Sequence, residues 1–141
     1  MNQENFAPPE TDVTPSELVD VAPELWNPDS AGALSIFCTP AFGSFLVLKN
    51  WQAIGDEKRI RSAKIWFGIS VAFFFLGLII QIFNFLYLFV WYFGSQKRQT
   101  IYIRKRWNNV YPQKSWWRPL LVGLLVAVAY YGLTGLLAWA I

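Results

Sequence analysis

The sequence predicts an all-α membrane protein with about three transmembrane spans and an acidic N-terminal tail. Hydrophobic residues make up 55% of the 141 residues, and the mean hydropathy is positive. Three long runs contain no charged side chain: residues 30–48, 65–96 and 119–141. A helix needs about 20 mostly apolar residues to cross a bilayer core. Backbone groups in lipid must be satisfied within the segment, which favours helices.

The acidic tail is expected to comprise residues 1–26. The first 30 residues contain seven acidic residues and no basic one. This composition predicts a disordered or loosely attached segment. A secretory signal peptide begins with basic residues before an apolar stretch, so we expect none here. The transmembrane domain is then expected to comprise residues 27–141.

The first span is expected over residues 28–54. Asn27, Pro28 and Asp29 supply an N-cap, a proline at the first helical position and an acid in the first turn. Pro40 removes a backbone donor in the middle of this span, so we expect a kink there. Membrane helices tolerate such prolines where neighbouring side chains compensate. The alternative is a segment that enters the bilayer and turns back at Pro40.

The second span is expected over residues 65–93, after a polar start at Asp56. About 29 helical residues would be roughly 43 Å long. This length exceeds the hydrocarbon core, so the helix must tilt, project or break. The alternative is a hairpin of two short helices that breaks near Gln81 to Asn84, which gives four short spans in total.

A basic loop over residues 94–116 and a third span over residues 117–141 complete the predicted domain. Five basic residues lie between residues 49 and 64, and seven lie between residues 97 and 118. The positive-inside rule would place both groups in the cytoplasm. Three full spans forbid this, whereas the hairpin alternative permits it with the acidic tail outside. The lack of a proline near the break favours three spans.

Small and polar residues within the spans predict where helices pack, because association in lipid depends on close approach and hydrogen bonds. Gln and Asn side chains in lipid are expected to face protein or a water-filled cavity. We expect packing within the chain, with a docking face or a polar conduction site as alternatives. The first span contributes Ala31, Ser35, Thr39 and Gly43, and the second contributes Ser70, Gly77, Gln81 and Asn84.

Basic and aromatic residues alternate in the predicted loop. Beside a membrane, this composition indicates contact with anionic lipid headgroups. We therefore expect the bilayer as a partner and no nucleic acid. The cations assigned to headgroups are Lys97, Arg98, Arg104, Lys105 and Arg106.

The chemistry of common enzymes is missing from the sequence. The chain has no histidine, which is the commonest general base and a frequent metal ligand. No acidic residue lies in an apolar run, and no phosphate-binding glycine loop is present. We therefore expect no enzymatic activity, no metal and no cofactor.

Four segments together resemble a known group: LWNP (25–28), FCTPAFGSFLVLKNWQAIG (37–55), WYFGSQK (91–97) and YPQKSWWRPLL (111–121). They are similar to a diffuse group of small, mostly uncharacterised bacterial inner-membrane proteins with an F-x-x-P-x-F-G-x-x-L…N-W-x-x-x-G core. The resemblance implies bacterial origin, a multi-pass inner-membrane location and a helical architecture. It implies no particular activity.

The leading hypothesis is a non-enzymatic inner-membrane protein that acts through protein–protein interaction in the membrane. Its narrower form is an immunity protein against a membrane-acting secreted toxin, by analogy of size and location. The alternative is a small channel or transporter component, or an accessory subunit of a larger membrane complex.

Overall fold

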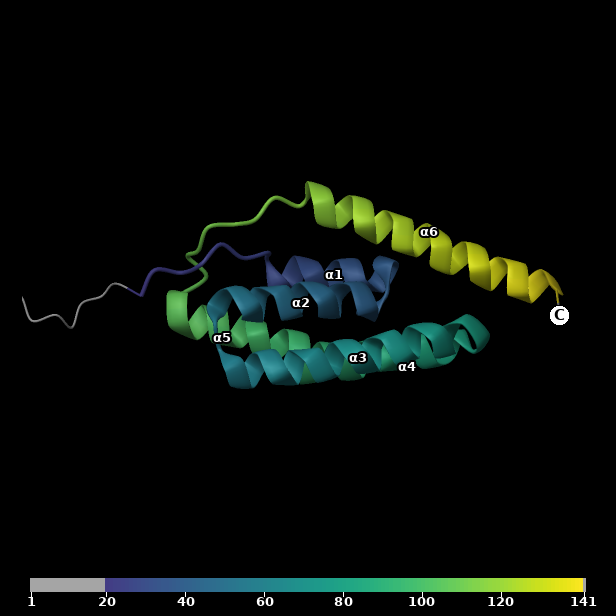
Figure 1. The fold of residues 1–141 in the computed structure, drawn as a ribbon, viewed down its shortest axis with the longest axis horizontal. Coiled ribbons are helices and arrows are strands. Elements are labelled where there is room, and N and C mark those ends of the chain that lie inside the picture. Colours follow the sequence, from purple (N-terminus) through teal and green to yellow (C-terminus); the bar gives the residue numbers. More distant parts are fainter. Residues whose placement is uncertain (1–19, 141) are drawn as a thin grey trace, which may run out of the picture.

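The structure is a computed structural model that describes residues 20–140. The described residues are mostly helical and contain no β-strand, which confirms the all-α class. Figure 1 shows two helical hairpins lying against each other and one separate long helix. The elements are α1 (Pro28–Cys38), α2 (Pro40–Ile54), α3 (Glu57–Ile79), α4 (Gln81–Trp91), the π-helix η1 (Tyr92–Gln96), α5 (Lys97–Trp107) and α6 (Trp117–Ala140).

Helices α1 and α2 form an antiparallel hairpin (Figure 1). The chain reverses at Thr39, whose φ of 76° and ψ of 154° are not helical. Asn50, near the end of α2, bonds to the backbone of Trp26, just before α1. The expected kinked helix over residues 28–54 is therefore wrong, and the chain turns back before Pro40, as in the alternative. Pro40 disfavours a helical conformation at Thr39 and suits the first position of α2.

Helices α3 and α4 form the second hairpin, and the chain reverses at Ile80 with φ of −131° and ψ of 90°. The rings of Phe73 and Tyr87 stack across it with centroids 4.4 Å apart. The expected continuous helix over residues 65–93 is therefore wrong. The break lies directly before the Gln81–Asn84 stretch that the alternative proposed. Folding back lets polar groups of the two arms bond to each other, which a lone helix in lipid cannot do.

The expected basic loop over residues 94–116 is largely helical. Helix α4 continues through η1 into α5, so only the residues after Trp107 and before Trp117 form a connection. One side of this helical segment packs on the first hairpin, because Gln96, Gln99 and Ile103 are each fully buried. This buried side supplies the packing that stabilises a helix where the charge pattern indicated a loop.

The core lies between α2 and the second hairpin. Val47 and Trp51 of α2 pack there with Tyr87 and Trp91 of α4. Gly43 allows this approach, since a Cβ at its position would lie 2.5 Å from the Trp91 ring. A smaller cluster around Ala31 and other residues of the first hairpin adjoins it.

Helix α6 packs loosely on the rest of the molecule. It contacts α1 and α3 and extends past the hairpin tips to the C-terminus (Figure 1). Gly123 allows a close approach to the first hairpin, because a Cβ there would lie 3.1 Å from Cys38 and from Phe42. Within the described residues, α3 and α6 are the two helices long and apolar enough to cross a membrane.

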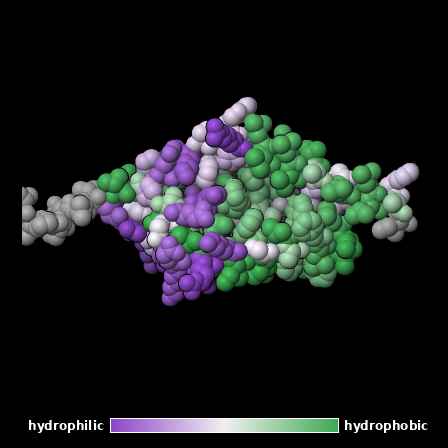
Figure 2. Space-filling model, in the orientation of Figure 1, coloured by the Kyte–Doolittle hydropathy of each residue, from purple (hydrophilic) through white to green (hydrophobic). Residues whose placement is uncertain are grey.

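One end of the molecule is polar and the remainder is apolar (Figure 2). Both basic segments lie at the polar end, because Arg59 at the start of α3 lies over the ring of Tyr102 in α5. Three full spans would have separated these segments, so the structure agrees with the charge pattern. Leu25 also lies at this end and donates a backbone hydrogen bond to Pro112.

The end of the acidic tail therefore lies beside the basic segments. This differs from the four-span alternative, which placed the tail on the opposite side. The reason is that α1 and α2 turn back as a hairpin and bring both of their outer ends to the same place. The remaining tail residues, 1–19, lie outside the described part of the chain.

Candidate functional site

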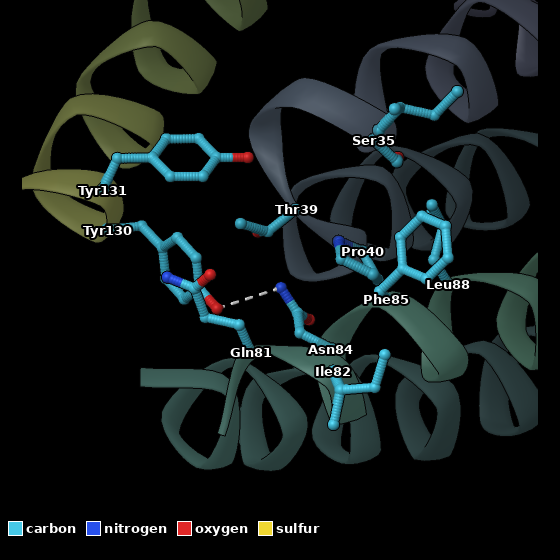
Figure 3. Close-up of a pocket in the computed structure, with 11 residues that line it drawn as sticks. Ser35, Thr39, Pro40, Gln81, Ile82, Asn84, Phe85, Leu88, Tyr130 and Tyr131 are labelled. Atoms are coloured by element: carbon cyan, nitrogen blue, oxygen red, sulfur yellow. Dashed lines mark hydrogen bonds between the residues drawn. The ribbon is translucent and has the colours of Figure 1, made fainter. Parts of the chain in front are cut away.

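A cavity of about 420 Å³ lies where the tips of both hairpins meet α6 (Figure 3). Its walls come from the Thr39 turn, from the first turns of α4 and from the middle of α6. Among residues 20–140, no charged side chain lines it. Six of its lining residues carry polar side chains: Ser35, Thr39, Gln81, Asn84, Tyr130 and Tyr131. Four of these were predicted from two separate sequence patterns, and the structure brings them together.

Two polar atoms at the cavity are buried and have no hydrogen-bond partner among the described residues. They are Oγ1 of Thr39 and Oδ1 of Asn84, and Thr39 is only 2% exposed. Asn84 uses its amide nitrogen to donate to the hydroxyl of Tyr130 at 3.3 Å (Figure 3). Leaving a buried polar atom unpaired costs about 1–3 kcal/mol. Two residues that line the cavity therefore each carry a polar atom that lacks a hydrogen-bonding partner among the described residues.

Gly77 of α3 leaves the space that lets Asn84 and Tyr130 meet. A Cβ at Gly77 would lie 2.6 Å from the hydroxyl of Tyr130 and 2.7 Å from the Cβ of Asn84. Any larger residue would push α4 and α6 away from α3. Gln81, from the same predicted stripe, is exposed at the rim of the cavity.

The remaining predicted packing residues hold the hairpins together. Gly43 lies against Ser35 across the first hairpin, and Ala31 is fully buried. The ridge of small residues therefore joins the two arms of one hairpin and does not run unbroken along a single helix. Ser70 lies 2.9 Å from the hydroxyl of Tyr87 and also bonds to Ser44.

Sequence reasoning missed three buried amides at the polar end of the bundle. Asn50 bonds to both backbone groups of Trp26, at 3.0 and 2.8 Å. Gln99 donates to the carbonyl of Val47 at 2.9 Å, and Gln96 donates to the carbonyl of Pro28 at 2.6 Å. The available signal was the spacing of three between the two glutamines, which places uncharged amides on one side of a helix.

The five cations predicted to contact headgroups all lie on α5 and are exposed. Arg106 is bound to Asp20, with its Nη2 3.0 Å from Oδ1. The guanidinium of Arg106 also lies over the ring of Trp107. Hydrogen bonding to this guanidinium lowers the pKa of Asp20 below its ordinary value of 3.8. The other four make no ion pair with residues 20–140. This leaves a cationic surface around the end of the acidic tail.

Comparisons with known proteins do not add to this description. The chain matches no protein-family model, no curated protein and no solved structure. Within residues 20–140, no group of three or more His, Cys, Asp or Glu side chains is placed to hold a metal ion. The resemblance to small inner-membrane proteins stays a prediction.

Proposed function

We propose that the protein is a non-enzymatic, multi-pass membrane protein that acts by binding another protein in the membrane through the outer face of α6. The observation that carries the proposal is the arrangement of residues around this helix. Its inner face is buried and contains Pro119, Gly123, Tyr130 and Thr134. The opposite face is exposed in the part of the chain that the structure describes.

The outer face of α6 has the spacing of a helix–helix contact. Its residues recur alternately at intervals of four and three, which keeps them in one stripe with a period of 3.5 residues. This period is typical of left-handed helix pairs, in soluble coiled coils and in membranes. We call this stripe the outer seam: Leu121, Leu125, Val128, Gly132, Gly135 and Trp139.

Two glycines distinguish the outer seam from a surface that only faces lipid. Exposed leucine and valine are expected wherever a helix contacts lipid. Glycine is different, because small residues in membrane helices mark places where another backbone approaches closely. A Cβ at Gly132 or Gly135 would meet nothing within 4 Å. The described chain therefore does not use the space that these glycines leave.

A membrane location is supported by the distribution of polarity. The apolar part of the molecule exposes large side chains such as Ile79, at 78%, and Trp139, at 89%. Lipid would cover this surface, whereas water would not tolerate an apolar patch of this extent. We propose the bacterial inner membrane, with the basic end in the cytoplasm as the positive-inside rule requires.

Site-specific photo-cross-linking in the native membrane tests the outer seam. A photoreactive residue at Val128 should give a discrete cross-linked product, and one at Leu124, which is exposed beside the outer seam, should give none. Gly132→Leu should abolish the product by filling the space. The control Gly68→Leu makes the same change at another open position, in α3, and should have no effect. Equal products from Val128 and Leu124 would contradict the proposal.

The narrower form of the proposal is immunity against a membrane-acting secreted toxin. It is supported by the apolar surface and by the resemblance to small bacterial inner-membrane proteins. Deleting the gene in a toxin-producing strain should make those cells sensitive to their sisters, and unchanged survival would refute this form. The alternative, a channel or transporter component, is favoured only by the polar cavity. Unchanged flux in liposomes after Gln81→Leu with Asn84→Leu would exclude it.

A further inference from the structure

We propose that the cavity at the hairpin tips binds an uncharged amphiphile, a molecule with an apolar chain and a hydroxyl or amide group that donates a hydrogen bond. This site lies on the inner face of α6, opposite to the outer seam. It is therefore independent of the protein-binding function proposed above. It shares with that function only the membrane location.

The unpaired atoms in the cavity specify the polar group of the ligand. Oδ1 of Asn84 can only accept, so the ligand must bring an O–H or N–H. The hydroxyl of Thr39 can then accept from the ligand or donate to it. A carbonyl or ester without a hydrogen would leave Asn84 unpaired. A group that both donates and accepts satisfies the two buried atoms together.

The absence of charge at the cavity excludes an ionised ligand. Every polar side chain that lines it is neutral, so an ionised headgroup would have no counter-charge. Burying an isolated charge without a partner is far more costly than burying a hydroxyl. The basic residues that bind anions lie at the opposite, polar end of the molecule (Figure 2). An anionic phospholipid headgroup therefore belongs there.

The rim of the cavity fits an apolar chain that enters from lipid. Ile36, Ile82 and Phe85 line the cavity and are also exposed, at 56%, 55% and 54%. The cavity therefore opens onto the apolar surface. Its volume of about 420 Å³ is within the range of small-molecule pockets, about 300–1,000 Å³. A few converging polar groups in a mostly apolar cleft are typical of such pockets.

The two chain reversals explain why the cavity exists at this depth. The chain leaves helical geometry at Thr39 and again at Ile80, and α4 begins without a side-chain cap. Irregular backbone at membrane depth is tolerated only where protein buries it or where it lines a cavity. Broken helices frame ligand sites in transporters for the same reason. Both breaks of this chain border the same cavity.

A photoreactive diacylglycerol is a suitable probe, because it has long apolar chains and one free hydroxyl. The full-length protein is placed in phosphatidylcholine vesicles that contain the probe. Labelling should be saturable and should map to the segments around Ile82 and Tyr130. Unlabelled diacylglycerol should compete. Triacylglycerol, which lacks the donor, and phosphatidic acid, which is charged, should not compete.

Substitutions that keep shape and remove hydrogen bonding test the named atoms. Thr39→Val and Asn84→Leu should each weaken saturable labelling by about tenfold, as the loss of one good hydrogen bond predicts. Gln81→Leu, at an exposed position, should weaken it less without affecting folding. The control Gln52→Leu changes an exposed amide at the polar end and should have no effect. Helix content by circular dichroism shows whether each variant is folded.

Three outcomes would overturn the proposal. Labelling that does not saturate would mean that the cavity holds water alone. Equal competition by triacylglycerol would show that the ligand needs no hydrogen-bond donor. Equal competition by phosphatidic acid would show that the ligand need not be uncharged.

Gly132→Leu should leave labelling unchanged. Failure of this site and failure of the outer seam are therefore separate results.

Discussion

Asn50 holds the start of the first hairpin to its end through one side chain. Its Oδ1 accepts from the backbone of Trp26 at 3.0 Å, and its Nδ2 donates to the carbonyl of the same residue at 2.8 Å. Nδ2 also donates to Gln99 at 3.1 Å, which ties α5 to both arms. The carboxamide thus replaces the backbone partners that Trp26 lacks outside a helix.

Asn50→Leu should destabilise the protein, because the size of the side chain is kept while both backbone groups of Trp26 lose their partners. Each buried group left unpaired costs about 1–3 kcal/mol. Unfolding in mixed detergent with increasing denaturant measures the change. Gln52→Leu, two residues along the same helix and exposed, is the control and should unfold like the parent protein. A loss of stability equal in both variants would contradict the role assigned to Asn50.

Residues with a local signal were easier to predict than residues that act over long distances. Four of the six polar residues of the cavity were recognisable, because uncharged amides and hydroxyls stood out in apolar runs. Asn50 and Gln99 were missed, because they lie in mixed segments where polar residues are ordinary. Their importance comes from partners far along the chain, which the sequence alone does not place.

The same distinction holds for whole helices. The predicted starts at Asn27 and Asp56 are present: Asn27 accepts from the backbone of Asp29 at 2.9 Å, and Asp56 accepts from the backbone of Arg59 at 3.0 Å. Helix α2 ends at Ile54, the predicted last residue, and Gly55 follows it with a φ of 80°. Caps depend on neighbouring residues, so local patterns suffice. The reversal at Ile80 contains neither glycine nor proline at its centre. This reversal depends on packing between the two arms of the hairpin. In the sequence, only the length of the apolar run and the distribution of charge indicated it.

Close approach of the two arms of the first hairpin depends on Gly43. A Cβ there would overlap Ser35 and would lie 2.5 Å from the ring of Trp91. Gly43→Ala should therefore force the arms apart and destabilise the fold by about 1–3 kcal/mol, the usual cost of overpacking. Thermal unfolding in detergent, followed by circular dichroism, measures this.

Gly68→Ala is the matched control for the change at Gly43. Gly68 lies within α3 and has open space where a Cβ would be added. Alanine in a helix interior is favoured over glycine by about 0.5–1 kcal/mol. The control should therefore be neutral or slightly stabilising. If Gly43→Ala behaved in the same way, the hairpin would not depend on a close crossing at this point.

At the scale of the whole molecule, charge predicted the arrangement better than hydrophobic length. The basic residues around Arg59 and those around Arg106 lie at one end, as the positive-inside rule demanded. Two hairpins meet that demand, because each returns the chain to the end from which it started. The apolar runs had suggested single long spans because two short apolar helices, one directly after the other in the chain, have the same composition as one long helix.

Labelling of single cysteines from the two sides of the membrane tests this arrangement. In a Cys38→Ala background, Lys58→Cys and Lys105→Cys should react with an impermeant maleimide from the same side, because α3 and the α4–α5 helix are antiparallel. Ala140→Cys, at the end of α6, should react from the opposite side, since α6 is long and apolar enough to cross. Intact spheroplasts and permeabilised cells distinguish the sides. A continuous helix over residues 65–93 would place Lys58→Cys and Lys105→Cys on opposite sides, and that result would refute the second hairpin.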